Sequence, residues 1–293
     1  MNFCGIYILL GLSLNVIVGY AGLFNLGHAA FYAVGAYATA ILSTRFGIPT
    51  PVLLPVAALA AASFAYVISR PIIHLRGDYL CVVTIGFGEI VRIALINNPG
   101  GLTGGVNGII GIPRPHLGLF TVRSVDHYYY YILCFVVLFA WAMGRLEKSR
   151  IGRALTCIRE EETAAEAMGI DTAALKLLAF VLGAAGAGVA GNLYATKMTL
   201  IAPESFNFWE SCVMFSIVVL GGIGSVPGVI LAGLGMSALP ELFRGFAQAR
   251  LLVFGLAMVL MMIFRPQGLW PSAHWRRQVQ REKESPAASE VAS

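Results

Sequence analysis

Apolar stretches about as long as a membrane is thick alternate with short polar segments along most of the chain. A transmembrane helix needs ~20 mostly apolar residues, and this criterion predicts about nine candidate spans. They cover residues 3–19, 28–43, 51–69, 79–96, 128–144, 175–195, 208–222, 226–243 and 251–264. The pattern predicts an all-α fold, a polytopic transmembrane helix bundle of about 8–9 spans with a helix on the cytoplasmic side.

Composition supports a membrane protein. The chain has 293 residues, of which 58% are hydrophobic and 12% charged, whereas soluble domains have roughly 45–50% apolar and about 25% charged residues. The first apolar run has no Lys or Arg and continues into further apolar sequence, so we expect a first span there and no cleaved secretory signal. The five cysteines are scattered without a C-x-x-C pair, which indicates neither a metal site nor a disulfide framework.

One long polar passage, residues 145–176, separates two of the predicted spans. Basic residues come first and an acidic cluster follows, and an interrupted apolar stripe predicts a short helix from Arg153 to Gly169. The members of that stripe are Ile151, Leu155, Ile158, Ala165 and Met168. Gly169 is placed for a left-handed C-cap, and Asp171 or Thr172 for capping the next helix. Between two spans such a helix has little of its own chain to pack against, so we expect it to dock on a partner; a plain polar loop is the alternative.

Positive charge predicts the orientation. If residues 145–176 are cytoplasmic, thirteen Lys and Arg fall on that side and six on the other, with Arg92 inside a span. This is the positive-inside bias. It places the C-terminus in the cytoplasm and, with an odd number of spans, the N-terminus outside. The predicted domains are a transmembrane domain, residues 1–270, with the polar loop at 145–175, and a disordered cytoplasmic tail, residues 271–293.

A glycine-rich run after the first span is expected to interrupt the helices. Gly19, Gly22 and Gly27 surround Asn25, and His28 opens the second span. Irregular backbone in lipid is tolerated only where protein or a water-filled cavity covers it. The run is therefore either a broken segment lining a transport pathway or a tight cytoplasmic turn, with His28 a pathway group or a hydrogen-bonded packing residue.

Two charges occur inside the fourth predicted span. Glu89 and Arg92 are three residues apart and so share one helix face. Charges at this depth usually pair and face the bundle interior. We expect an ion pair there, either structural or lining the pathway.

Several passages together resemble one protein family. The runs GRALTCIREEETAAEAMGI, NLGHAAFYAVGAY and LRGDYLCVVTIGFGEIVR, with T-G-G-x-N-G-I after the fourth span, resemble the LivM-type permeases of branched-chain amino acid ABC importers. The resemblance covers nearly the whole chain, from Gly11 to about Trp270. It implies that residues 145–175 form a coupling loop that sits in a groove of an ATPase subunit, with Arg153, Arg159, Glu162, Ala165 and Gly169 in it.

The resemblance also implies a function and partners. The chain would form half of the translocation pathway of an ATP-driven importer in the bacterial inner (plasma) membrane, for branched-chain or other hydrophobic amino acids. Its partners would be a second related permease, two cytoplasmic ATPase subunits and an extracytoplasmic substrate-binding protein. ATP and Mg would lie on the ATPase subunits, with no cofactor in this chain. Family members commonly carry additional sequence before the first span, which leaves the side of the N-terminus open.

Other functions remain as alternatives at this point. The sequence has no G-x-x-x-x-G-K-[ST] phosphate-binding motif, no H-E-x-x-H and no G-x-S-x-G, so we predict no catalytic and no metal-binding residues. A secondary transporter or channel for a small solute would explain a broken helix and the Glu89/Arg92 pair, but not the polar loop. An ABC permease for urea or a related small compound would fit the same motifs.

Overall fold

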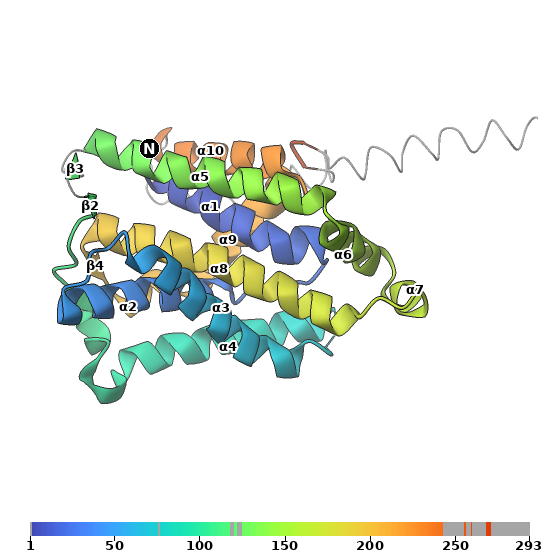
Figure 1. Ribbon diagram of the computed structural model, residues 1–293, viewed down its shortest axis with the longest axis horizontal. Helices are drawn as coiled ribbons and strands as arrows, with labels where there is room; N and C mark the ends of the chain where they lie inside the picture. Colours follow the sequence, from blue (N-terminus) through green and yellow to red (C-terminus); the bar gives the residue numbers. More distant parts are fainter. Residues whose placement is uncertain are drawn as a thin grey trace, which may run out of the picture.

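Long helices lie side by side along one axis, and the short elements gather at the two ends (Figure 1). The computed structural model describes residues 2–75, 77–117, 120–121 and 125–242, together with residues 255, 259 and 268–270. The long helices are α1 (Asn2–Asn15), α2 (His28–Phe46), α3 (Leu53–Ile72), α4 (Asp78–Ile96), α5 (Val125–Lys148), α8 (Thr172–Met198), α9 (Phe208–Gly221) and α10 (Val226–Leu242). A π-helical turn, η1 (Val16–Tyr20), continues α1.

The helices occupy the predicted spans. Five described segments are long and apolar enough to cross a membrane, namely Phe3–Tyr20, Leu53–Ile72, Asp78–Ile96, His127–Lys148 and Thr172–Met198. The helices α2, α9 and α10 fill three further predicted spans, the last two as shorter apolar helices. The predicted span at 251–264 lies outside the described residues except for positions 255 and 259, as does the predicted tail. The fold is that of an all-α, multi-pass membrane protein.

The two ends of the bundle carry different short elements (Figure 1). One end carries the helices α6 (Arg150–Glu160) and α7 (Glu162–Ala167). The other carries the 3-10 turns η2 (Pro99–Gly101), η3 (Gly105–Asn107) and η4 (Pro203–Phe206) and the strands β1 (Ile109–Ile110), β2 (His116–Leu117), β3 (Phe120–Thr121) and β4 (Leu200–Ile201). Strand β1 pairs antiparallel with β4, and β2 with β3.

Helix α8 forms the centre of the packing, because glycines let its neighbours approach closely. A Cβ added at Gly188 would lie 2.5 Å from the Ala57 carbonyl oxygen of α3, and one at Gly191 would lie 2.5 Å from the Tyr32 carbonyl oxygen of α2. In a bilayer, such small residues allow the backbone contacts that hold helices together. Helices α2, α3 and α8 therefore form a tightly packed set.

The chain after α10 returns to the end of the bundle that carries α6. The Leu269 amide donates to the Leu220 carbonyl at 2.8 Å, and the Trp270 amide to the Gly221 carbonyl at 3.2 Å. Residues 220 and 221 close α9 next to the start of α10. Residues 268–270 are thus fixed against the α9–α10 turn.

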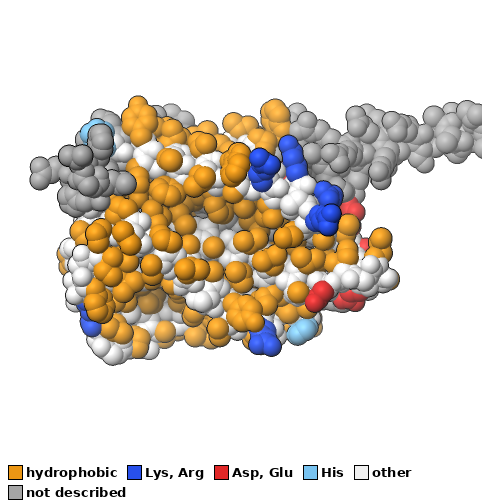
Figure 2. Space-filling model, in the orientation of Figure 1, with side chains coloured by type: hydrophobic (Ala, Val, Ile, Leu, Met, Phe, Trp, Pro, Cys, Tyr) orange, Lys and Arg blue, Asp and Glu red, His pale blue; other side chains and the backbone are white. Residues whose placement is uncertain are grey.

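The flank between the two ends is largely apolar. Figure 2 shows hydrophobic side chains over most of this face, with basic and acidic side chains gathered toward the end that carries α6 and α7. Basic residues there include Arg145, Lys148 and Arg150 at the junction of α5 and α6. This distribution fits an apolar belt in lipid with a charged end in water.

Candidate coupling and translocation sites

The interruption after α1 is a partly buried segment of non-helical chain, in which Leu23, Asn25 and Gly27 are buried and Gly22 and Phe24 are exposed. Helix α1 passes into the π-helical turn η1, and regular structure resumes only at His28. Asn25 is 1% exposed and accepts a hydrogen bond from the Gly27 amide at 3.0 Å. Gly27 approaches Thr84 of α4 so closely that a Cβ would collide with the Thr84 carbonyl. This burial favours the broken segment over a tight turn at the surface.

The first residue of α2 lies deep in the bundle. His28 is fully buried, and its Nε2 is 2.8 Å from the Ser13 hydroxyl of α1. Ser13 packs against Gly186, the fifteenth of the 27 residues of α8. The next amide, that of Ala29, donates to the Ser211 hydroxyl of α9 at 3.0 Å. Helix α2 therefore begins about halfway along α8, as the discontinuous helices of transporters do.

His28 keeps one unsatisfied ring nitrogen. Its Nδ1 and the Asn25 Nδ2 are both buried and have no hydrogen-bond partner among the described residues. Buried polar atoms are normally paired. The break in the helices therefore places two unpaired polar atoms inside an apolar bundle, and the packing interpretation of His28 accounts for only one of its two nitrogens.

Arg159 of α6 is bonded directly to this broken region. Its Nη1 donates to the Gly19 carbonyl of η1 at 2.6 Å. The stem of Arg159 packs on Gly22, where a Cβ would lie 2.7 Å from the Arg159 Cγ and where φ is +69°. Partial burial lowers the pKa of Arg159, and the nearby Glu160 acts against that shift. Arginine nevertheless remains charged at neutral pH.

The turn between α9 and α10 also contacts Asn15 and lies close to Arg159. The Gly224 amide donates to the Asn15 side-chain oxygen at 2.9 Å, and a Cβ at Gly224 would lie 3.1 Å from the Arg159 Nη1. Four segments thus meet around Arg159, namely α6, the end of α1, the segment after it and the α9–α10 turn. We call the set Asn15, Gly19, Gly22, Arg159 and Gly224 the arginine hub.

The predicted single helix from Arg153 to Gly169 is wrong in one respect. The structure has two helices, α6 and α7, because Glu161 is extended, with φ −153° and ψ 106°. The extended residue ends α6 and starts a new helix, α7, at Glu162. The break also lets Glu162 reach the Lys176 ammonium of α8 at 2.5 Å, with the Lys176 side chain only 4% exposed.

The predicted caps of this loop are confirmed. Gly169 has φ +80° and its amide donates to the Glu166 carbonyl at 2.9 Å. The Asp171 carboxylate accepts from the Ala174 amide at 2.9 Å, at the first turn of α8. Arg153 is exposed, and its Nη1 donates to the Lys148 carbonyl at 2.8 Å, which satisfies an end of α5.

The apolar stripe of the loop packs differently from the prediction. Leu155, Ile158 and Ala165 are buried in the chain itself, because α6 lies on the ends of α5, α8 and η1. Met168 is 83% exposed and Ile151 39% exposed. The expectation that the whole stripe would be left for a partner is therefore wrong, since its centre already anchors α6 to the bundle.

A hollow of about 560 Å³ opens beside α7. Its lining comes from the end of α3 and from the α7–α8 junction, and consists of Ile73, His74, Glu162, Glu166, Gly169, Ile170, Asp171, Thr172, Ala173 and Lys176. Three of these residues are acidic. The hollow is therefore a polar, mainly acidic recess at the end of the bundle that carries α6 and α7.

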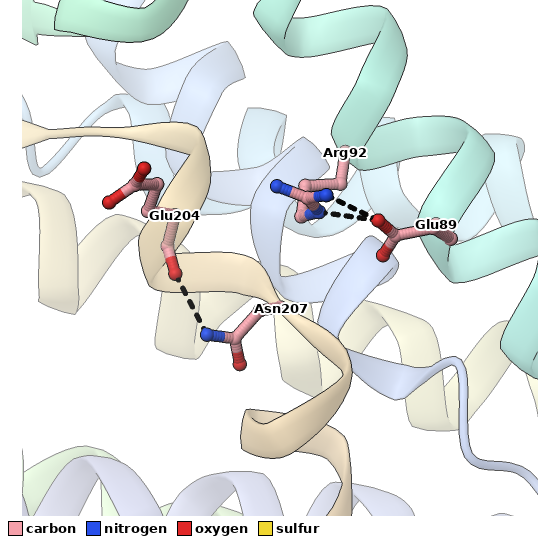
Figure 3. A network of polar contacts seen from close by, with 4 residues as sticks. All are labelled: Glu89, Arg92, Glu204 and Asn207. Atoms are coloured by element: carbon pink, nitrogen blue, oxygen red, sulfur yellow. Dashed lines mark hydrogen bonds and ion pairs between the residues drawn. The ribbon is translucent and has the colours of Figure 1, made fainter.

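Glu89 and Arg92 form the predicted ion pair on α4. The Arg92 Nε donates to the Glu89 Oε1 at 2.8 Å, and the Arg92 Nη2 contacts the same oxygen. The pair points across to η4 and the start of α9, where Glu204 and Asn207 lie, and the Glu204 carboxylate is turned away from it (Figure 3). The side chains of Arg92 and Glu89 are 27% and 40% exposed, so the expectation that they face the bundle interior is wrong.

The structure separates the candidate residues into two groups. Asn25 and His28 lie in the buried break, and among the described residues no hydrogen bond joins them to Glu89 or Arg92. The sequence interpretation missed Asn15 and Gly224, which complete the arginine hub. An asparagine in the first apolar run was the available signal for Asn15.

Comparisons with known proteins identify the family of the chain. The family model described as "Branched-chain amino acid transport system / permease component" matches residues 1–264. The chain belongs to this family. The high-affinity branched-chain amino acid transport system permease protein LivM of Escherichia coli is 44% identical over 289 residues, covering 91% of this permease and 68% of the relative.

More distant relatives fall in the same group. The permease protein BraD of Pseudomonas aeruginosa is 29% identical, covering 90% of this chain and 91% of its own. The permease protein LivH of Salmonella typhimurium is 26% identical, covering 90% of each. No solved structure matches this permease. Within the described part of the chain, no three His, Cys, Asp or Glu side chains are grouped so that they could hold a metal ion.

Proposed function

We propose that this permease forms half of the translocation pathway of an ATP-driven importer of branched-chain or other hydrophobic amino acids in the bacterial inner membrane. Its family membership and its relatives named LivM, BraD and LivH support this proposal. A second, related permease would complete the pathway. Two cytoplasmic ATPase subunits would hydrolyse ATP with Mg, and an extracytoplasmic binding protein would deliver the substrate.

The observation that carries the coupling mechanism is the hydrogen bond from Arg159 to Gly19. Helix α6 rests on the bundle through Leu155 and Ile158, while the exposed surface around α7 and Met168 stays available to an ATPase subunit. A displacement of α6 acts on the end of α1 through Arg159. Since the broken segment starts at the same point, motion of the motor would reach the middle of the membrane through covalently continuous chain.

The acidic recess beside α7 supports the same assignment. Glu162 is held by Lys176, and the Glu166 carboxylate accepts from the Thr172 hydroxyl at 2.8 Å. These bonds fix α7 to the first turn of α8. A groove on the ATPase that grips α7 would therefore move α8, which is the centre of the helix packing.

Arg159→Ala tests the coupling mechanism. The substitution removes a charge-assisted hydrogen bond worth about 1.5–3 kcal/mol together with the packing of the side-chain stem. In proteoliposomes that contain the whole transporter, we expect ATP hydrolysis to persist while uptake of radiolabelled leucine falls at least about tenfold. Lys148→Ala, an exposed basic residue nearby, is the matched control and is expected to leave both rates unchanged.

Two results would contradict these assignments. Unchanged uptake per ATP in Arg159→Ala would remove the arginine hub from the coupling path. Uptake that is driven by a proton or sodium gradient and is indifferent to ATP would instead favour a secondary transporter. A panel of solutes competing with leucine for the binding protein separates amino acid import from import of urea or a related compound.

A further inference from the structure

A second cavity lies at the opposite end of the bundle from α6. It has a volume of about 150 Å³ and is formed where α1, α2, α8, η4 and α9 meet. Its lining consists of Phe3, Ile6, Tyr7, Tyr32, Tyr194, Ser205 and Glu210. These residues come from four distant parts of the sequence, so the fold has to be complete before the cavity exists.

Aromatic rings form one wall of the cavity. Tyr32 is 3% exposed, and its ring centroid is 5.4 Å from that of Tyr194 and 4.9 Å from that of Phe206. The Tyr194 and Phe206 centroids are 5.9 Å apart. Packed against each other in this way, the rings have fixed positions, and two of them, Tyr32 and Tyr194, line the cavity. Aromatic rings attract cations.

A carboxylate lies on the same cavity. Glu210 is partly buried in the first turn of α9, and the Tyr7 hydroxyl donates to its Oε2 at 3.0 Å. Among the described residues no hydrogen bond reaches the other oxygen, Oε1. The N-terminal end of a helix favours a negative charge, so the fold holds a carboxylate with one open acceptor beside aromatic rings.

A positive charge, that of Lys197, lies beside the lining residue Phe3. Phe3 is 42% exposed and marks the opening. The Lys197 ammonium lies over the Phe3 ring, 4.4 Å from its centroid. A carboxylate and aromatic rings therefore line the cavity, and a lysine lies over the exposed ring of that lining.

We propose that this cavity binds the ammonium group of the transported amino acid, with Glu210 as its charge partner, Tyr32 and Tyr194 as its aromatic wall, and Lys197 facing the substrate carboxylate. The inference rests on the proposed function and adds a substrate-binding site to it. A carboxylate in the lining and a lysine beside the lining residue Phe3 match the two charges of a zwitterion. An aromatic cage with a carboxylate is also how proteins recognise ammonium groups elsewhere.

The size of the cavity agrees with partial entry of the substrate. A cavity of about 150 Å³ holds a ligand of roughly six heavy atoms such as benzene. A branched-chain amino acid is larger, so its ammonium end fits inside while the carboxylate stays at the mouth, beside Lys197. A longer or bulkier side chain would have to remain outside as well.

The experiment measures binding of a small amine to the whole transporter, purified with its partner subunits and without ATP. The probe is 3-methylbutylamine, and 3-methylbutanol is the uncharged probe of the same shape. We expect the amine to raise the Tm of the transporter in a saturable way and the alcohol to leave it unchanged. Glu210→Gln is expected to raise the Kd of the amine at least about tenfold, since a charge-assisted contact is lost.

A second variant guards against a simple folding defect. Tyr194→Leu keeps the carboxylate and removes one aromatic ring. It should raise the Kd of the amine by about threefold or more. Glu204→Gln, an exposed carboxylate six positions before Glu210, and Tyr130→Leu, on an exposed face of α5, are the matched controls and should bind the amine as the wild type does.

The outcomes separate this inference from the proposed function. An amine that does not bind the wild-type transporter, or that binds Glu210→Gln as tightly as the wild type, overturns the site even where ATP-driven uptake is intact. Uptake that is indifferent to ATP overturns the proposed energy source, whereas saturable binding of the amine that is lost in Glu210→Gln supports the site in that case too.

Discussion

Helices α1 and α4 have the same hydropathy but different surroundings. The apolar windows of Phe3–Tyr20 and Asp78–Ile96 both have a mean hydropathy of 1.9, yet 78% of the first is buried within the chain and only 11% of the second. Hydropathy indicates whether a helix can cross a membrane, because it measures how favourably the side chains leave water. It does not report whether the helix faces protein or lipid.

The two helices also differ in the burial of their polar side chains. Helix α1 ends at buried Asn15, and the segment after it leads to Asn25 and His28, each enclosed by the fold. Helix α4 instead carries Glu89 and Arg92 on a partly open side. Charges exposed to lipid are costly, so we expect the open side of α4 at this level to face a pathway or a second permease. Substitutions can distinguish the two kinds of helix surface.

The largest expected effect comes from placing a side chain in a close contact between two helix backbones. Gly188→Leu in α8 would place a side chain where the Ala57 carbonyl and the Ala61 side chain already lie, at 2.5 and 2.8 Å from its Cβ. Part of the clash is with backbone, which cannot move aside by changing rotamer, so we expect a larger loss of stability than from a cavity and little folded transporter, measured as the monodisperse yield in detergent. Gly86→Leu in α4, with nothing within 4 Å, is the matched control. Equal yields would contradict the central role of α8.

A smaller effect is expected from removing apolar volume. Leu12 of α1 is fully buried, and Leu12→Ala should lower the free energy of unfolding by about 2–5 kcal/mol. Ile90 of α4 is 64% exposed, and Ile90→Ala should change it by about 0.5 kcal/mol or less. Thermal unfolding of the isolated chain measures both. If Ile90→Ala is much more harmful in the assembled transporter, a partner covers α4.

The smallest effect on stability is expected at the ion pair. Glu89→Gln breaks a pair that is partly exposed, which should cost about 1 kcal/mol or less. We nevertheless expect uptake to fall, because the pair points into the space beside η4 and α9 (Figure 3). Asp78→Asn, in the exposed first turn of the same helix, is the control. Intact uptake and assembly in Glu89→Gln would show that the pair is not part of the pathway.

Local sequence signals were sufficient for several features. Apolar runs predicted where α1, α3, α4, α5 and α8 lie, because span length is set by the bilayer. Gly169 and Asp171 predicted the end of one helix and the start of the next, since caps depend on residues within one turn. The spacing of Glu89 and Arg92 predicted their ion pair for the same reason.

Features that depend on tertiary contacts were not predictable in this way. The extended Glu161 follows partly from the ion pair that Glu162 makes with Lys176, fourteen residues away. The burial of Leu155 and Ile158 depends on where the end of α5 places α6. Glu210 offered a signal, a carboxylate at the start of an apolar run, but nothing local connected it with Tyr7, 203 residues away.

The hydrogen bonds of Leu269 and Trp270 to the end of α9 determine at which end of the bundle these two residues lie. Helix α10 starts beside that point and leads away from it, yet Gly268 is back beside Gly222. Asn2 starts α1, whereas Trp270 is bonded at the α9–α10 turn, which contacts the other end of α1 through Asn15, so the two residues lie at opposite ends of the bundle. Reporter tags at these two positions should therefore be reached from opposite compartments of the cell.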